Sequence, residues 1–254
     1  AIDSAVAHAK EMIEVGATII DLGGESTSPN AQMVATEQEL QRVIPVVDAI
    51  RRHCGSEIWL SIVTSNLQVI EAAVAAGADI WNDVRALKRQ GAAAMAAKLN
   101  IPVMLMHMRG EPTTMTGLAN YEDVVSEVIT ELSERIDEVV SLGVKRDKII
   151  IDPGFGFAKD YQHHCALLTQ LEQLKILKLP LMFGISRKRF LAEVLDKSGV
   201  DSFANSTPSE RDTVSTVAGL LALQQGASII RTHNIAMVQQ VVALWRQLTT
   251  SNCQ

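Results

Sequence analysis

The sequence predicts an α/β fold in which helices and parallel strands alternate along the chain. One pattern, a helix followed by Gly-Ala and then an apolar run, returns at Gly16-Ala17, Gly77-Ala78 and Gly226-Ala227. Short apolar runs such as Ile149–Ile151 end at a polar residue, which is typical of strands buried on both faces. The composition, 47% hydrophobic but only 4% aromatic, also favours helices packed on a parallel sheet over an aromatic-rich β sandwich.

Seven strands are expected, each joined to the next by a helix. The strands are expected within residues 17–25, 58–63, 76–84, 103–107, 149–152, 181–185 and 225–233. The helices are expected at about residues 3–15, 37–52, 66–76, 91–99, 120–142, 163–177, 187–197, 210–225 and 235–249. No stretch of linker composition divides these elements, so we predict a single domain over residues 1–254.

Local signals support the boundaries of these elements. In the first helix Ala5, Ala9 and Met12 fall on one face, and Gly16 ends the helix as a C-cap. Pro102 and Pro180 each stand just before a strand, where a missing N–H costs little. Residues 149–159 are the most informative stretch, because three isoleucines run directly into Asp152 and a Pro-Gly turn. The simplest interpretation of Asp152 is a cap for that turn, and the polar ends of the other strands favour a site instead.

Alternating units of this length fit either an eight-stranded barrel or a doubly wound open sheet. No glycine-rich dinucleotide loop opens a helix in this sequence. Polar residues end nearly every predicted strand, and in a barrel all these ends meet at one rim, where barrel enzymes keep their sites. We therefore predict the TIM (β/α)8 barrel class, with the first strand and its loop missing from this sequence.

Charge and cysteine content limit the classes of partner. The net charge of −6 and the absence of a basic stripe argue against nucleic acid. Cys54, Cys165 and Cys253 are far apart and lack metal-ligand spacing, which favours a reducing, cytoplasmic setting. No apolar run reaches membrane-spanning length and no signal peptide is evident, so no membrane association is expected.

The polar residues at the strand ends are the candidate functional residues. They are Glu25, Ser26, Thr27, Thr64, Ser65, Asn82, Asp83, His107, Asp152, Ser186, Arg187, Lys188, Arg231 and His233. Taken alone, His107 is expected to be a hydrogen-bonded wall residue rather than a metal ligand, and Asp83 with Arg85 an ordinary surface pair. Taken together, the Asn, Asp and Lys side chains suit a flat heterocycle with amide-like edges. Arg231 and His233, two apart on one strand, point the same way and suit a phosphate.

Five motifs also resemble the dihydropteroate synthase family, and they occur in the family's order over the whole chain. They are Asp21–Pro29, Leu105–Met108, Asp152–Phe157, Ser186–Lys188 and Arg231–His233. The resemblance implies a TIM barrel that joins 7,8-dihydropterin-6-ylmethyl diphosphate to 4-aminobenzoate, releasing diphosphate and making 7,8-dihydropteroate for folate synthesis. It also implies assistance by Mg²⁺, a homodimer and a target for sulfonamides.

The resemblance assigns roles to residues that match the family's motifs. The catalytic residues would be Lys188, Asp152, Asn82, Arg231 and His233. The pterin would contact Asn82, Asp152, Lys188 and Met106, with Val63 at a further pterin-facing position. The diphosphate would be held by Arg231, His233 and Asn82, and the aminobenzoate would lie among Thr27, Pro29, Phe157, Ser186 and Arg189.

The sequence departs from the family pattern at several positions. The family's first strand and its Asn-x-Thr-Pro-Asp-Ser-Phe loop are absent, which removes an Asn tied to Mg²⁺ and part of the aminobenzoate pocket. Val63 replaces an Asp that binds pterin, and Ser28 replaces an Arg near the diphosphate. Asn234 for Asp, Ala158 for Gly and Arg189 for Ser are milder changes.

These departures leave two alternatives to an active synthase. One is a degenerate paralogue that binds pterin or diphosphate weakly without turnover, which Val63 and Ser28 favour. The other is a methyltransferase-type pterin-binding barrel, which would share the pterin cleft but would not need Ser186-Arg187-Lys188 beside a diphosphate site.

Overall fold

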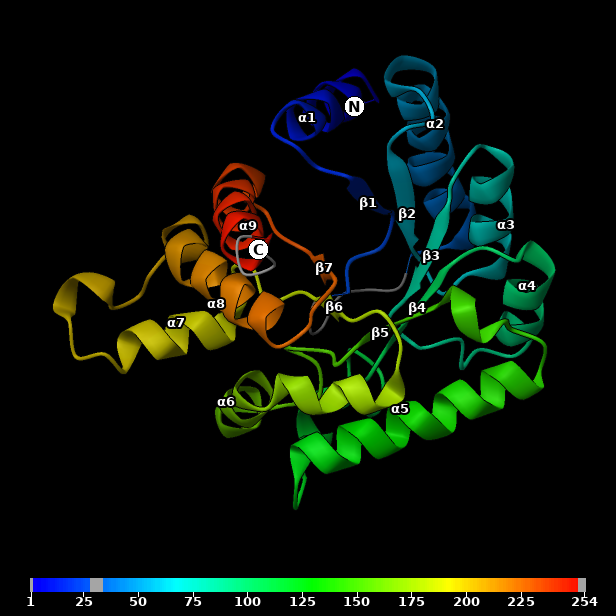
Figure 1. The fold of residues 1–254 in the computed structure, drawn as a ribbon. Coiled ribbons are helices and arrows are strands. Elements are labelled where there is room, and N and C mark those ends of the chain that lie inside the picture. Colours follow the sequence, from blue (N-terminus) through cyan, green and yellow to red (C-terminus); the bar gives the residue numbers. More distant parts are fainter. Residues whose placement is uncertain (1, 28–33, 251–254) are drawn as a thin grey trace.

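The structure, a computed structural model, describes residues 2–27 and 34–250 and alternates helices with parallel strands (Figure 1). Its strands are β1 (Ile19–Gly23), β2 (Trp59–Val63), β3 (Ile80–Asp83), β4 (Val103–Met106), β5 (Ile149–Asp152), β6 (Met182–Phe183) and β7 (Ile229–Ile230). Its α-helices are α1 (Ile2–Glu14), α2 (Thr36–Cys54), α3 (Leu67–Ala75), α4 (Ala92–Leu99), α5 (Val124–Ser141), α6 (Tyr161–Thr169), α7 (Arg189–Asp196), α8 (Asp212–Gln224) and α9 (Ile235–Thr250).

All strand pairs are parallel and follow the order of the chain. Strands β1 to β5 form one sheet, a bridge between Ile151 and Leu181 connects β5 to the start of β6, and β6 pairs with β7. The helices lie outside this row of strands, as in a TIM-type barrel (Figure 1). The seven strands predicted from the sequence are therefore confirmed in the described part of the chain.

Side chains alternate between the inside and the outside of the barrel. Ile80, Met104, Ile150 and Met182, each from a different strand, form one interior cluster against which Ile19 and Ile229 pack. The intervening residues, such as Trp81 and Leu105, belong instead to the larger core between strands and helices. Because side chains alternate with a period of two, the residue two positions after each of these also points into the barrel. These later residues lie at the carboxyl ends of the strands, which form the rim.

Two helix predictions differ from the structure. The helix expected over residues 163–177 ends at Thr169 and continues as a 3₁₀ helix, Leu171–Leu177. The side chain of Gln225 donates to the carbonyl of Leu168 at 2.7 Å and so satisfies part of this helix end. The helix expected over 120–142 begins only at Val124, because the carboxylate of Asp123 accepts hydrogen bonds from the first turn.

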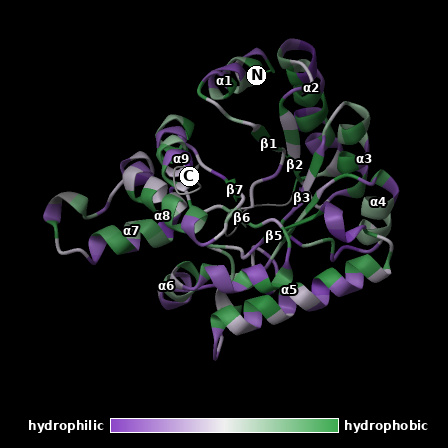
Figure 2. Ribbon diagram, in the orientation of Figure 1, coloured by the Kyte–Doolittle hydropathy of each residue, from purple (hydrophilic) through white to green (hydrophobic). Residues whose placement is uncertain are grey.

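The outer helices are amphipathic, as their colouring in Figure 2 shows most clearly on α5. Val125, Val128, Leu132 and Ile136 bury one face of α5. Among the described helices, none combines the length and apolar character needed to cross a lipid bilayer.

An aromatic stack fixes the segment that follows β5. The ring of His164 on α6 lies between Phe155 and Phe190, with centroids 5.9 and 4.9 Å away. Its Nε2 accepts a hydrogen bond from the amide of Gly156 at 2.7 Å, and its Nδ1 contacts the carbonyl of Asp160. Burial lowers the pKa of His164 to about 4, so the imidazole is neutral with its proton on Nδ1.

This neutral histidine makes stability depend on pH. Its pKa is about 4 in the folded protein against 6.5 for the unperturbed side chain, so the unfolded chain binds more protons between these values. The stabilisation is complete above pH 6.5 and is lost as the pH falls to 4, by about 3 kcal/mol for this residue. Denaturant unfolding at several pH values should show this slope, and His164→Gln, which keeps an acceptor for Gly156, should reduce it and leave the part due to His107, whose pKa burial also lowers to about 4.

The matched control is His8→Gln, since His8 is exposed on α1. It should leave the slope unchanged. An equal slope in His164→Gln and in the unmodified protein would show that His164 is not a source of the acid sensitivity.

Candidate active site

Residues from the two ends of the row of strands meet at the rim. The carboxylate of Asp21 on β1 accepts a hydrogen bond from Nε of Arg231, just after β7, at 2.7 Å. The side-chain amide of Asn82 on β3 lies 3.3 and 3.4 Å from the two oxygens of the same carboxylate. Asp21 therefore joins β1 to both β3 and β7, and a cation and an amide predicted as site residues lie close together.

Asp152 and Lys188 form the opposite charges of the site. Asp152 is buried at the end of β5, where its carboxylate accepts from the amide of Gly154 at 2.8 Å. Burial raises the pKa of Asp152, while the charges of Lys188 and Arg231 oppose that rise. Burial lowers the pKa of Lys188 to about 8, and the charge of Asp152 opposes that fall. The structure thus places a buried acid beside two cations at one rim.

The turn after β5 contacts both members of this pair. Gly154 has a φ of 72°, and a Cβ atom at this position would collide with the carbonyl oxygen of His107. The ammonium of Lys188 donates to the carbonyl of Phe155 and lies 4.7 Å from the centre of the Phe157 ring. Phe157 is buried, so its ring forms a wall of the site next to Lys188.

The residues predicted around the aminobenzoate lie on separate segments. Ser186 accepts a hydrogen bond from the backbone of His233 at 3.2 Å, and its hydroxyl lies 3.0 Å from Nδ1 of that histidine. Arg189 is exposed and begins α7. Thr27 is half-buried at the end of the segment after β1. Pro29, and Ser28 beside it, lie outside the described residues.

One side of the rim is apolar. Val63, at the end of β2, is paired in register with Asn82 and is 9% exposed. It belongs to a cluster of buried apolar residues at the rim, which also contains Val84, Met106, Met108, Met115, Phe157 and Ala158. A polar ring that enters here would meet amide and acid groups on one side and this apolar cluster, with no partner for an N–H group at Val63, on the other.

Two residues at the rim have left-handed backbone conformations. Ala158 has a φ of 47°, and its carbonyl accepts a hydrogen bond from the hydroxyl of Tyr121 at 3.0 Å. Arg187 has a φ of 60°, its amide donates to Ser215, and its guanidinium pairs with Asp212 at 2.6 and 2.7 Å. Such conformations are costly for residues with a Cβ atom and persist because the surrounding contacts hold them.

Two predictions made from single residues have different outcomes. His107 is buried and hydrogen-bonded to Glu131 and Lys159, so its assignment as a wall residue is confirmed. The interpretation of Asp83 and Arg85 as a surface pair is wrong. Asp83 is 0% exposed, and its carboxylate accepts from the amides of Arg85 and Leu87 at 3.0 and 2.8 Å, because it caps the turn after β3.

Sequence reasoning missed several residues that the structure brings to the rim, chiefly Asp21, Lys159 and Glu131. Asp21 lies two residues after Ile19 on β1, and Ile19 points into the barrel. The alternation of side chains along that strand therefore indicates that Asp21 also points inward. Lys159 ends the stretch 149–159 and was not assigned a role. Glu131 lies in the middle of α5, and no local pattern indicates that its carboxylate reaches His107.

The described residues offer little for a metal ion by themselves. Within residues 2–27 and 34–250 no group of three or more His, Cys, Asp or Glu side chains is arranged to hold a metal. Asp21, which already pairs with Arg231, and the amide oxygen of Asn82 are two oxygen donors at this rim. Mg²⁺ commonly takes only one or two carboxylates and completes its shell with water and phosphate oxygens, so these residues fit a metal that arrives with a diphosphate.

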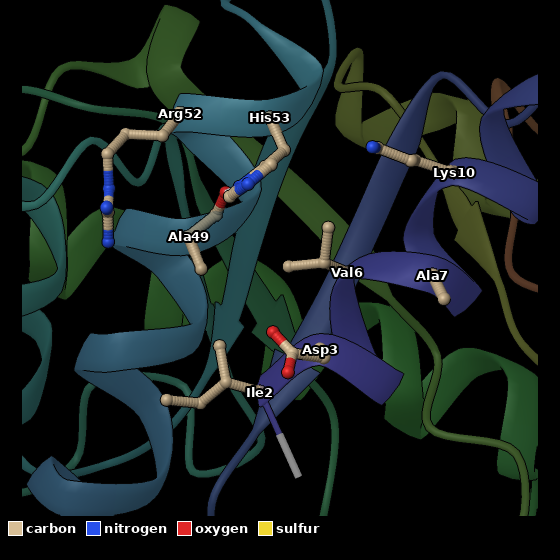
Figure 3. Close-up of a pocket in the computed structure, with 8 residues that line it drawn as sticks. All are labelled: Ile2, Asp3, Val6, Ala7, Lys10, Ala49, Arg52 and His53. Atoms are coloured by element: carbon tan, nitrogen blue, oxygen red, sulfur yellow. The ribbon is translucent and has the colours of Figure 1, made fainter.

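A cavity of about 400 Å³ lies elsewhere, between α1 and α2 (Figure 3). Its lining includes Val6 and Lys10 of α1 and Ala49 and His53 of α2. None of the residues that line it is a candidate site residue, so it takes no part in the rim site.

Comparisons with known proteins agree with this geometry. Residues 1–233 match the family model described as pterin binding enzyme. The dihydropteroate synthase of Haemophilus influenzae is 40% identical over 246 residues, which cover 96% of this chain and 85% of that protein. The dihydropteroate synthase of Escherichia coli K12 is 44% identical over 231 residues, covering 91% of this chain and 78% of that protein.

Solved structures give the same result. A Yersinia pestis dihydropteroate synthase in complex with a sulfonamide drug superposes with a TM-score of 0.91 at 36% identity, covering 99% of this chain and 87% of that one. A Xanthomonas albilineans dihydropteroate synthase with 4-aminobenzoic acid superposes with a TM-score of 0.88 at 39% identity, covering 98% and 85%. The predicted TIM-barrel class is confirmed, and the chain belongs to the dihydropteroate synthase family of pterin binding enzymes.

Proposed function

We propose that this protein is a dihydropteroate synthase, a transferase that joins 7,8-dihydropterin-6-ylmethyl diphosphate to 4-aminobenzoate. The observation on which the proposal depends is the meeting of Asn82, Asp152, Lys188 and Arg231 at one rim of the barrel. Asp152 lies within the electrostatic reach of both Lys188 and Arg231, and Arg231 and Asn82 share the carboxylate of Asp21. The family relationship favours this chemistry, and a solved structure of the Xanthomonas albilineans relative contains 7,8-dihydropteroate.

The residues of the rim suit the two halves of the pterin substrate. Asp152 and Asn82 offer acceptor and amide groups for the edges of a pterin ring, and Lys188, just before α7, would contact the ring. Arg231 and His233 would bind the diphosphate, since a guanidinium matches phosphate oxygens with paired donors. Met106 and Val63 would pack against the pterin, and Phe157, Ser186, Thr27, Pro29 and Arg189 would surround the aminobenzoate.

The reaction forms a C–N bond as a C–O bond breaks. The amine of 4-aminobenzoate attacks the methylene carbon of the pterin, diphosphate departs with the bonding electrons, and the amine loses one proton. Positive charge that develops on the methylene carbon spreads into the electron-rich pterin. Orientation of the two substrates and stabilisation of the departing diphosphate by Arg231 and His233 are then the main demands on the protein.

We propose that Mg²⁺ assists by neutralising the diphosphate oxygens. Asp21 and Asn82 are the residues that would hold it, because their side-chain oxygens lie beside Arg231, which is proposed to bind the same diphosphate. Mg²⁺ and Arg231 would therefore both stabilise the departing diphosphate.

Val63 favours a second candidate, a paralogue that binds pterin or diphosphate weakly without turnover. An apolar side chain beside Asn82 leaves pterin N–H groups on that side unpaired, at a cost of roughly 1–3 kcal/mol for each buried group. The two candidates separate in one assay. A synthase releases diphosphate and forms 7,8-dihydropteroate when both substrates are present, whereas the paralogue binds pterin in calorimetry but releases no diphosphate.

We further propose one barrel domain over residues 1–254 that works as a homodimer in the cytoplasm. Exposed apolar side chains on neighbouring helices, Val217 and Leu221 of α8 with Leu244 and Leu248 of α9, support association through the outer helices. Cys54 and Cys165 are free thiols, which suits a reducing compartment.

Restoring an acid at Val63 should raise activity. In Val63→Asp the new carboxylate would accept hydrogen bonds from the pterin, so kcat/KM should rise by about 5-fold to 160-fold, the equivalent of about 1–3 kcal/mol. Steady-state diphosphate release measures the change. Val63→Leu, which keeps the position apolar, is the control and should show no gain. Equal kcat/KM in Val63→Asp and the unmodified protein would mean that Val63 does not limit the reaction.

Removing the cation of Arg231 should weaken diphosphate handling specifically. Arg231→Met should lower kcat/KM for the pterin diphosphate by about 100-fold, as loss of a charge-stabilising donor commonly does. Binding of the pterin alcohol, which has no diphosphate, should change little in calorimetry. Arg52→Met on α2 is the control, since that side chain is exposed and far from the rim. Equal losses for both pterin ligands would argue against a diphosphate role for Arg231.

A further inference from the structure

We propose that Lys159, His107 and Glu131 form a positioning triad that holds the turn after β5 in the shape the site requires. We call residues 154–158 the site turn and these three residues the positioning triad. The proposal goes beyond the reaction assigned above and rests on it only for its kinetic test. None of the three is proposed to touch a substrate.

The ammonium of Lys159 is placed to use all three of its hydrogens. It lies 3.2 Å from the carbonyl oxygen of Gly154, 3.0 Å from that of Phe157 and 2.9 Å from Nδ1 of His107. A lysine ammonium has three donors and no acceptor, so these three partners satisfy it completely. One side chain therefore ties Gly154 and Phe157 of the site turn to each other and to His107, which follows β4.

His107 can accept from Lys159 only in one tautomer. Its Nε2 lies 2.9 Å from a carboxylate oxygen of Glu131, so Nε2 carries the proton and Nδ1 is the acceptor. Burial, with the charge of Lys159, lowers the pKa of His107 to about 4, which keeps the ring neutral. Burial alone would raise the pKa of Glu131. The hydrogen bonds from His107 and Arg109 instead lower it to about 2, so the carboxylate stays charged.

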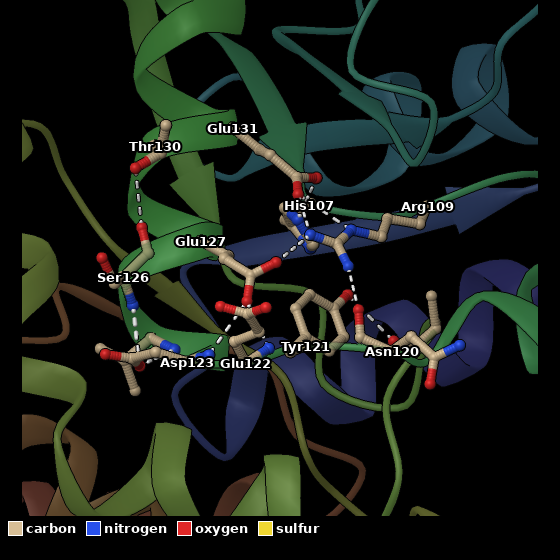
Figure 4. A network of polar contacts seen from close by, with 12 residues as sticks. His107, Arg109, Asn120, Tyr121, Glu122, Asp123, Ser126, Glu127, Thr130 and Glu131 are labelled. Atoms are coloured by element: carbon tan, nitrogen blue, oxygen red, sulfur yellow. Dashed lines mark hydrogen bonds and ion pairs between the residues drawn. The ribbon is translucent and has the colours of Figure 1, made fainter.

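Arg109 connects the positioning triad to a second contact with the same turn. Figure 4 shows His107 and Arg109 converging on Glu131 of α5, and the guanidinium of Arg109 also pairs with Glu127 at 2.7 Å. The same guanidinium lies 3.9 Å from the centre of the Tyr121 ring, whose hydroxyl donates to Ala158. Both branches of this network end on carbonyl groups of the site turn.

The site turn consequently has side-chain partners along most of its backbone. Asp152 and His164 accept from the amides of Gly154 and Gly156, and Lys188 donates to the carbonyl of Phe155. Lys159 and Tyr121 bind the remaining carbonyls described above. The ring of Phe157 and the Gly154 amide that donates to Asp152 both belong to this turn. A shift of the turn's backbone would therefore disturb the positions of Phe157 and Asp152 at the same time. A misplacement of about 1 Å can cost a factor of about 100 in rate.

The first test needs no substrate. In protein labelled with ¹⁵N-histidine, His107 should show the neutral tautomer with its proton on Nε2 at pH 6, which lies above the pKa of His107 and below that of Lys159. In Lys159→Met the Nδ1 resonance should move toward that of a ring nitrogen without a hydrogen bond, and in Lys145→Met, an exposed lysine before β5, it should not. A proton on Nδ1 of His107 in the unmodified protein would overturn the proposal, whether or not the protein is a synthase.

The second test compares two replacements of His107 that place an amide differently. Asn puts its oxygen near the position of Nδ1 and can still accept from Lys159, whereas Gln reaches the position of Nε2 and cannot. His107→Asn should therefore retain kcat within about threefold of the unmodified protein, while His107→Gln and Lys159→Met should lose about 10-fold to 100-fold. In the two weak variants the KM for 4-aminobenzoate should rise more than the KM for the pterin diphosphate, because Phe157 is displaced.

Melting temperatures separate positioning from folding. The expected result is a loss of kcat in Lys159→Met and His107→Gln at temperatures well below their melting temperatures, with His107→Asn restoring it. Equal activity of His107→Asn and His107→Gln, or a Lys159→Met enzyme with unchanged kcat and KM, would overturn the proposal. Should the parent enzyme show no turnover, the proposed function fails, and the histidine resonances alone then decide whether the positioning triad exists.

Discussion

The ion pair between Asp21 and Arg231 is the contact on which the arrangement of the site depends. It links β1 to the end of β7, the two ends of the row of parallel strands, and the same carboxylate lies beside Asn82 on β3. The carboxyl ends of parallel strands meet at one rim. This ion pair connects β1, the first strand of the row, to the residue that follows β7, the last strand. Without it the cation proposed to hold diphosphate would have no fixed place relative to the pterin side of the cleft.

The second constraint is the site turn, whose backbone groups are bound by side chains rather than by a sheet. Asp152, Lys188 and Lys159 all bind this turn, and the charges of the two lysines oppose the rise that burial causes in the pKa of Asp152. Burial lowers the pKa of Lys159 to about 7, and the negative charge of Asp152 opposes that fall. The groups that hold the turn in shape are therefore also the groups that set each other's protonation. Structure and electrostatics of the site are therefore coupled through a few residues.

Much of this could be predicted from the sequence because strands and their polar ends are local features. The apolar run before Asp152 and the pair Arg231 and His233 were enough to indicate strand ends at a barrel rim. The burial of Asp83 and the break after Thr169 were not predictable, since each depends on a partner far along the chain or on turn geometry. Glu131 is a long-range case too, as it lies 24 residues from the His107 it binds.

The left-handed conformations of Ala158 and Arg187 have a consequence for recognition. Contacts to Tyr121 and Ser215 hold these strained backbones in place. The shape of the rim at these two positions is therefore set by hydrogen bonds within the protein, which reduces the ordering that binding requires there. Discrimination between ring systems at this rim is then expected to depend on the fit of their edges, to which Asn82 offers an amide and Val63 an apolar side chain.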